Sequence, residues 1–137
     1  MCESFGEKKG DFYTFPEAKI IANLTPDDLS PIRSGFRAKY IIDAAKKVSS
    51  GEINLENLKK CDIDTAREKL MAIKGVGPKV ADCVLLFGLN KIDAFPKDVW
   101  IKKAMLNFFP NGLPECAKGY EGLVQQYIFF YARSLNI

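Results

Sequence analysis

The fold of this chain is decided by residues 70–83, which read Leu70-Met71-Ala72-Ile73-Lys74-Gly75-Val76-Gly77-Pro78-Lys79-Val80-Ala81-Asp82-Cys83. This stretch predicts the end of one helix, a tight turn with two glycines, and a second helix that begins at once. Gly75 stands just after a helix C-terminus, where a positive φ is favoured, and Gly77 allows a close approach of the backbone. Pro78 suits the first position of a helix, where its missing N–H costs nothing. The free amides of the turn, next to the positive end of the second helix, predict a phosphate site.

Lys79 falls in the first turn of this second helix, which is apolar on nearly all sides. Helical spacing predicts that Cys83, Leu86 and Phe87 flank its side chain. A lysine that is partly desolvated beside a helix N-terminus can lose its proton and act as a nucleophile. A lysine in an ordinary first turn instead extends its ammonium group into water, which is the more common case. The local sequence leaves both interpretations open.

The stretch from Gly75 to Cys83, followed by Phe95-Pro96-Lys97-Asp98-Val99-Trp100, resembles the helix–hairpin–helix and Gly/Pro…Asp signature of base-excision DNA glycosylases. Within that superfamily the chain is similar to the 8-oxoguanine DNA glycosylase branch, from about Cys2 to the C-terminus. The resemblance implies that Lys79 is the Schiff-base nucleophile and that Asp98 is the second catalytic group.

Asp98 follows Pro96 and precedes an apolar periodic run, a pattern typical of a helix N-cap. Capping alone would explain an aspartate at this position. A carboxylate held by backbone N–H groups is also well placed to stabilise the positive charge that develops on a deoxyribose when its base leaves. The resemblance assigns this role to Asp98.

The last predicted helix has one apolar stripe, which we expect to face the core: Tyr120, Leu123, Val124, Tyr127, Ile128, Tyr131 and Leu135. Phe129 and Gln125 lie on another side, four residues apart. A phenyl ring and an amide at this spacing suit a pocket for a flipped base, although a second core contact fits equally well. The resemblance implies that Gln125 and Phe129 bind the oxidised guanine and that Cys83 contacts it. By itself Cys83 is a small core residue, and we assign Phe87 to the same base-binding group.

The segment Gly35-Phe36-Arg37-Ala38-Lys39-Tyr40 also matches a part of this family. The resemblance implies that Phe36 enters the duplex as a wedge and that Arg37 contacts the orphaned base. Without the family, these two residues are a loop anchor and a solvated charge. The turn of the hairpin completes the expected DNA contacts, through Lys74, Gly75, Val76 and Gly77.

Length and composition predict one globular domain over residues 1–137, with 47% hydrophobic residues and the hairpin at about 65–89. A net charge of +3 permits a nucleic-acid partner without requiring one. No run is long enough to span a membrane and no signal pattern begins the chain, so we expect a soluble intracellular protein, cytoplasmic near the nucleoid or nuclear. There is no histidine, and the four cysteines have neither zinc nor iron–sulfur spacing. We expect reduced thiols and no metal or organic cofactor.

Hydrophobic periodicity predicts an all-α chain, a compact bundle of short helices around the helix–hairpin–helix motif, with no strand. A capping box at Thr65–Glu68 is expected to start the helix that enters the glycine turn. The other expected helices cover about 16–23, a short segment after Thr25, and residues 36–50, 55–60, 98–108 and 120–135.

Two features depart from the family pattern. Trp100 stands where many relatives carry a histidine that touches phosphate. The family's N-terminal sheet domain, including the glycine carbonyl that recognises the oxidised base, has no counterpart, so we expect either a fragment or a minimal natural form.

The first hypothesis is a monomeric bifunctional glycosylase and AP lyase acting on 8-oxoguanine in damaged double-stranded DNA. The alternative is a truncated, non-catalytic helix–hairpin–helix module that binds duplex through phosphates. A third hypothesis, a monofunctional enzyme for alkylated bases, fits less well because such enzymes generally lack the hairpin lysine.

Overall fold

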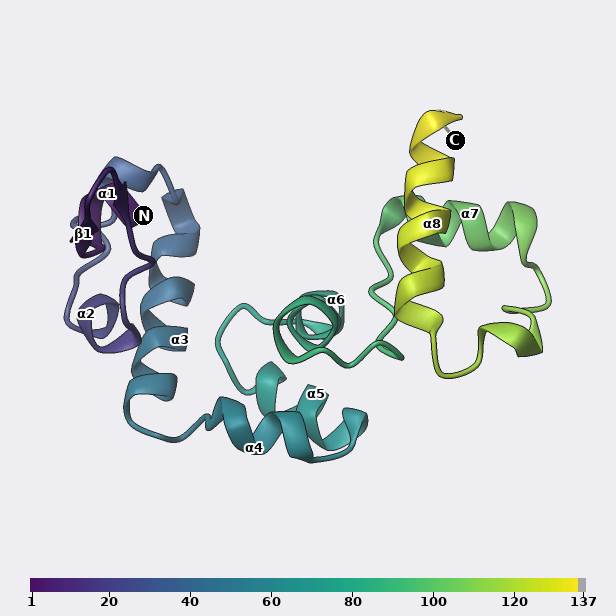
Figure 1. Cartoon of the computed structure of the whole chain (residues 1–137), viewed down its shortest axis with the longest axis horizontal. Coiled ribbons are helices and arrows are strands. Elements are labelled where there is room, and N and C mark those ends of the chain that lie inside the picture. The colour runs from purple at the N-terminus through teal and green to yellow at the C-terminus, as the bar shows by residue number, and fades with distance from the viewer. Residues whose placement is uncertain (136–137) are drawn as a thin grey trace. The chain divides into compact units, whose positions relative to one another are not determined.

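The computed structural model describes residues 1–135 and divides them into two units, each treated by itself below. The first unit contains Met1–Leu55 and Ala72–Gly75, and the second contains Glu56–Met71 and the chain from Val76 onward. The predicted all-α class is confirmed, because the described elements are helices apart from one pair of very short strands (Figure 1). Within these residues, no helix is both long enough and apolar enough to cross a membrane.

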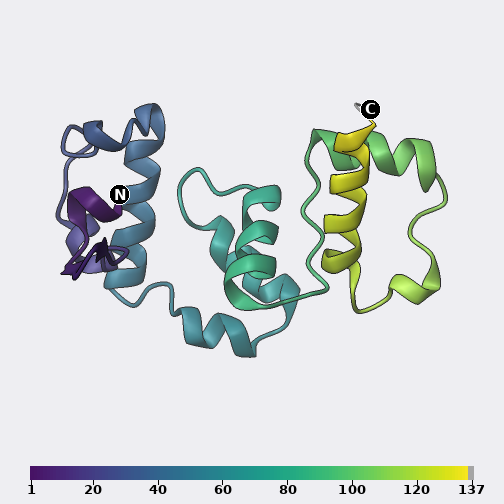
Figure 2. The same ribbon diagram turned by 45° about the horizontal axis from the view of Figure 1, so that its top comes forward.

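The first unit is built around α3 (Ala38–Ser49), whose buried side packs on Leu29. The chain before α3 forms α1 (Cys2–Phe5), an antiparallel pair of β1 (Lys8–Lys9) with β2 (Phe12–Tyr13), and α2 (Ala18–Ala22). Helix α2 lies beside α3 in both views (Figures 1 and 2). Gly51, at φ +81°, follows the last turn of α3 in the left-handed conformation that is typical of a glycine after a helix C-terminus.

Two expectations for this unit are wrong. The strand pair was not expected, because two-residue strands are too short to show alternation of apolar and polar residues. The helix expected after Thr25 is only a turn, followed by the short 3₁₀ segments η1 (Ser30–Ile32) and η2 (Gly35–Arg37). Thr25 does cap this turn, because its Oγ1 accepts the N–H of Asp28 at 3.3 Å, and Asp28 Oδ2 accepts the N–H of Thr25 at 2.8 Å in return. Pro31 has no N–H to give to a continuing helix, which explains the early stop.

The second unit begins with α4 (Leu55–Lys60), whose first residue lies at the boundary, and α5 (Ile63–Met71). The hairpin turn then leads into α6 (Pro78–Cys83), which continues as a π-helical turn, η3 (Val84–Gly88). The unit is completed by α7 (Val99–Phe108), the 3₁₀ segment η4 (Glu115–Ala117) and α8 (Glu121–Ser134). Helices α7 and α8 pack on each other around Ile101, Ala104, Ile128 and Ala132.

The cap of α5 differs from the expectation. Asp62 Oδ1 accepts the N–H of Thr65 at 2.8 Å, so the helix starts at Ile63 and Thr65 lies inside it. Both residue types are good N-caps, and here Asp62 is the cap, with Thr65 at the third helical position as the donor.

The expected core face of α8 is also wrong. The buried residues are Gly122, Gln125, Ile128 and Ala132, whereas most of the predicted stripe is exposed, with Tyr127 at 79%. The reason is steric: a Cβ on Gly122 would lie 2.4 Å from the carbonyl oxygen of Ala94. Small residues therefore let α8 approach its neighbours, and the helix turns its aromatic side outward.

Candidate active site

The hairpin turn has the predicted backbone, with Gly75 at φ +81° and Pro78 at the first position of α6. Gly75 is also required by packing, because a Cβ at this position would lie 2.5 Å from the ring of Tyr40 on α3. Gly77 differs, since its φ of −97° suits any residue and no atom lies within 4 Å of the place of its Cβ. Lys74 donates its N–H to Asp43 Oδ2 at 2.8 Å, so α3 holds the start of the turn in two ways.

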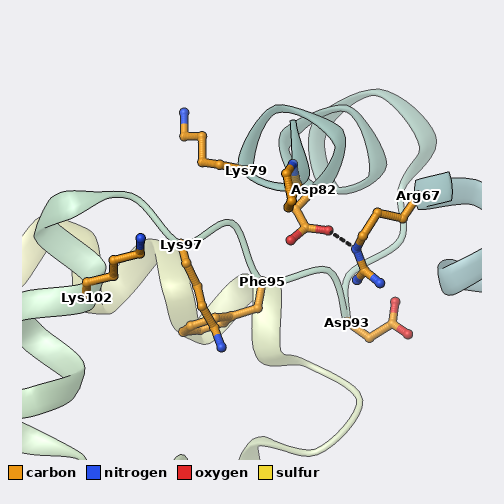
Figure 3. Close-up of a pocket in the computed structure, with 8 residues that line it drawn as sticks. Arg67, Lys79, Asp82, Asp93, Phe95, Lys97 and Lys102 are labelled. Carbon is orange, nitrogen blue, oxygen red and sulfur yellow. Dashed lines mark hydrogen bonds and ion pairs between the residues drawn. The ribbon is translucent and has the colours of Figure 1, made fainter. Parts of the chain in front are cut away.

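Lys79 is exposed, as are its neighbours Pro78 and Val80. The exposed position agrees with the second interpretation, a lysine that extends into water, because the first turn of α6 is exposed and does not pack against the core. Figure 3 shows the Lys79 side chain extending away from Asp82.

Lys79 belongs to a mainly charged cavity of about 560 Å³. The cavity is lined by Arg67, Pro78, Lys79, Asp82, Asp93, Phe95, Lys97 and Lys102 (Figure 3). Of the residues predicted for the site, only Lys79 is in this lining. The other lining residues come from α5, α6, α7 and the segment before α7. Pro78, Asp82, Phe95 and Lys97 belong to the two motif stretches, whereas Arg67, Asp93 and Lys102 were not predicted for the site.

Arg67 crosses from α5 to α6 and is held by two carboxylates. Its Nε donates to Asp82 Oδ1 at 2.7 Å, and its Nη1 donates to Asp64 Oδ1 at 2.5 Å. The hydrogen bond to Asp82 raises the pKa of the Arg67 guanidinium above its usual range. Asp82 is 9% exposed, so its buried charge depends on this partner. The pair fixes the helix that carries Lys79, three residues before Asp82.

Asp98 caps α7, as predicted, and its Oδ1 accepts the N–H of Ile101 at 2.8 Å. Within residues 1–135 this is the one hydrogen bond of its side chain, which leaves Oδ2 available to a ligand. Asp98 does not line the cavity of Lys79, but its neighbour Lys97 does. The two predicted catalytic residues thus belong to the same unit, and the residue before Asp98 shares the cavity of Lys79.

Gln125 and Phe129 lie in the core of the second unit. Gln125 is 4% exposed, and its Nε2 donates to the carbonyl oxygen of Pro96 at 3.1 Å, while its Oε1 accepts from Gln126. Phe129 is half-buried against the α7–α8 core. This arrangement agrees with the core contact that the spacing also allowed. The hydrogen bond to Pro96 nevertheless connects Gln125 to the segment that leads into Asp98.

The other two residues predicted for base binding lie on α6 and η3. Cys83 is half-buried at the end of α6, and Phe87 is 65% exposed in the π-helical turn. The π turn begins just after Cys83 and changes the helical period on which the predicted position of Phe87 depends. Neither residue lines the cavity of Lys79.

Phe36 and Arg37 form an exposed pair at the start of α3, in the first unit. Phe36 is 67% exposed, and the Arg37 guanidinium carbon lies 4.8 Å from the centroid of its ring. The ring of Tyr40 makes an edge-to-face contact with the ring of Phe36, with 6.3 Å between the two centroids. Gly35, at φ +54°, turns the chain so that this short segment can project.

Trp100 is flanked by two cations of the second unit. Lys103 Nζ lies 5.8 Å and the Arg133 guanidinium carbon 5.1 Å from its ring. The ring faces of tryptophan attract such cations.

Comparison with known proteins places this arrangement in a family. The chain is 35% identical to a probable N-glycosylase/DNA lyase of Methanothermobacter thermautotrophicus, over 89% of this chain and 48% of that protein. It is 32% identical to a putative DNA-3-methyladenine glycosylase of Bacillus subtilis, over 77% of this chain and 38% of that protein. No family model matches the chain.

Among solved structures, the chain matches the 8-oxoguanine glycosylase/lyase of Clostridium acetobutylicum in complex with double-stranded DNA that contains cytosine opposite 8-oxoguanine. The TM-score is 0.85 with 38% identity, over 99% of this chain and 52% of that one. The chain thus spans about half the length of these relatives. From its hairpin motif, its helical fold and these matches, the chain belongs to the helix–hairpin–helix superfamily of base-excision DNA glycosylases, in the branch of the 8-oxoguanine N-glycosylase/DNA lyases.

Proposed function

We propose that this chain carries the catalytic residues of a bifunctional DNA glycosylase and AP lyase that removes 8-oxoguanine from duplex DNA. The observation that supports this most is the exposed Lys79 amine, at the predicted place in the hairpin and beside the segment of Asp98. Named relatives are N-glycosylase/DNA lyases, and one related structure contains duplex DNA with cytosine opposite 8-oxoguanine. The chain acts as a monomer in the compartment that holds the genome.

The chemistry divides between the two residues. The neutral amine of Lys79 attacks C1′ of the target nucleotide while the N-glycosidic bond breaks and the base leaves with the bonding electrons. Asp98 stabilises the positive charge that develops on the sugar. The departing base takes one proton from the lysine nitrogen. A second proton passes from that nitrogen to O4′ as the C1′–O4′ bond of the sugar ring breaks, which gives the imine between Lys79 and C1′. Loss of a proton from C2′ then breaks the C3′–O bond by β-elimination and releases the 3′ phosphate as leaving group. Hydrolysis of the imine regenerates the lysine.

The remaining predicted residues recognise the DNA. Gln125, Phe129, Cys83 and Phe87 are assigned to the flipped base, which requires the core around Gln125 to open or rearrange when DNA binds. Phe36 and Arg37 are assigned to the gap in the stack and to the orphaned cytosine. The backbone of Lys74–Gly77 is assigned to a phosphate.

The test is incubation of the chain with a duplex that contains 8-oxoguanine opposite cytosine. The proposal predicts free 8-oxoguanine and a strand nick, and Lys79→Gln removes both. Asp98→Asn lowers the rate of base release by about a hundredfold or more, as loss of one electrostatic group does in other enzymes. Binding to the duplex with neither product contradicts the enzymatic proposal and supports a non-catalytic DNA-binding module.

A second experiment uses a duplex that contains an alkylated purine, and it tests whether the chain acts on that class of base instead. The match to a putative DNA-3-methyladenine glycosylase makes this substrate a reasonable competitor. Release of the alkylated base without a nick, unchanged in Lys79→Gln, indicates a monofunctional enzyme. Our proposal predicts no such release.

A further inference from the structure

The cavity that contains Lys79 holds more positive charge than its own carboxylates neutralise. Arg67 is already paired with Asp82 and Asp64. The other lining cations are three lysines, and the other lining carboxylate is Asp93, which is exposed.

The three lysines, Lys79, Lys97 and Lys102, come from α6, from the segment before α7 and from α7 (Figure 3). Throughout residues 1–135, none of their ammonium groups has a carboxylate within ion-pair distance. Lysines that line one cavity without a carboxylate partner can together bind an anion.

The lining selects an anion in preference to a base. Phe95 is the one aromatic residue described in the lining, and Lys97 Nζ lies 5.9 Å from the centroid of its ring. Phe95 is also half-buried against the α7–α8 core, so the lining offers a base little aromatic surface on which to stack. In duplex DNA the anionic group is the phosphodiester, and lysine binds it as a point charge.

We propose that Lys97 and Lys102 bind a backbone phosphate next to the target nucleotide, in the cavity that they share with Lys79. This inference rests on the proposed function and adds to it a binding site for the sugar–phosphate backbone. The phosphate is joined to the target sugar by a few covalent bonds. Holding it fixes C1′ near the Lys79 amine, while the base is directed to a different place.

The first arm of the test measures the salt dependence of binding to a duplex that carries a tetrahydrofuran abasic-site analogue opposite cytosine. In the double variant Lys97→Gln/Lys102→Gln, binding weakens and the slope of log Kd against log[KCl] falls by about one, as expected for loss of one phosphate contact. The matched control is Lys103→Gln, because Lys103 is on the same helix but faces Trp100 and not the cavity. The control keeps the wild-type slope.

The second arm replaces single phosphates on either side of the analogue with neutral methylphosphonates. In the wild-type chain, one linkage next to the analogue weakens binding when it is neutralised. In the double variant, the same replacement has no further effect. The three lysines replaced in this test, Lys97, Lys102 and Lys103, are exposed. Far-UV circular dichroism of the variants should therefore match that of the wild type.

The outcomes separate the two proposals. Duplex binding with an unchanged slope in the double variant, or the same methylphosphonate profile in both proteins, overturns the phosphate site and leaves the proposed function standing. Failure of the wild-type chain to bind any duplex at low salt overturns the proposed function and this inference together.

Discussion

Asp43 accepts the backbone N–H of Lys74 through its Oδ2 atom at 2.8 Å, across 31 residues of sequence. The helix that begins just after Phe36 and Arg37 therefore also fixes the start of the hairpin turn. In the proposed function, one helix thus sets both the orphan-base contacts and the first residue of the phosphate-binding turn.

Replacing Asp43 should loosen this anchor. Asp43→Ala leaves the Lys74 amide without its partner and should lower the free energy of unfolding by about 1 kcal/mol, the typical worth of such a bond. Asp43→Asn keeps an acceptor and should restore most of this loss. Urea denaturation gives the free energies, and hydrogen exchange of the Lys74 amide reports the bond directly. Equal exchange rates in the wild type and the alanine variant would show that the hydrogen bond to Asp43 does not stabilise the turn.

The two glycines of the turn should respond differently to alanine. Gly75→Ala meets both a left-handed backbone and the Tyr40 ring, and should destabilise the chain by about 1–3 kcal/mol. Gly77→Ala meets neither, and should change stability by at most about 0.5 kcal/mol. Thermal or urea unfolding of the two variants provides the comparison. If Gly77→Ala binds duplex DNA much more weakly while remaining as stable, its role is to let the DNA backbone approach.

Replacing Gln125 should lower the stability of the chain as well as its rate of base release. Gln125→Leu leaves the buried carbonyl of Pro96 unpaired and should destabilise the chain by about 1–3 kcal/mol. Its effect on base release must therefore be measured at a temperature where the variant is fully folded. A stability equal to that of the wild type would contradict the buried hydrogen bond between α8 and the segment before Asp98.

Acid should weaken the cap of α5. The N–H of Thr65 donates to Asp62 and holds the pKa of its carboxyl below the usual value. The stabilisation is thus fully present above the unfolded-state pKa of an aspartate, about 3.9, and is lost as pH falls through the lower folded-state pKa. Stability measured from pH 6 to pH 2 should fall less steeply in Asp62→Asn than in the wild type.

The sequence allowed prediction of what depends on neighbouring residues. The positive φ of Gly75, the helix start at Pro78, the cap at Asp98 and helix 55–60 all follow from local backbone chemistry. Each of these features needs only the residues within one helical turn.

Features that depend on distant contacts were missed. Hydrophobic periodicity favoured the aromatic stripe of α8 for the core, but the small residue Gly122 decides which side can approach Ala94 and Leu86. The Arg67–Asp82 pair and the Asp43–Lys74 anchor join residues 15 and 31 positions apart, and charge alone does not single them out among the chain's many charged residues. The exposure of Lys79 likewise depends on how α6 packs.

The central claim is that Lys79 forms a covalent imine with the sugar, and borohydride trapping measures this most directly. The chain is incubated with a duplex that contains an abasic site opposite cytosine, borohydride is added, and the products are separated on a denaturing gel. The account predicts a protein–DNA adduct for the wild type and for the control Lys103→Gln, and none for Lys79→Gln. An adduct of equal yield in Lys79→Gln, or a wild-type chain that binds the duplex but forms no adduct, would contradict it.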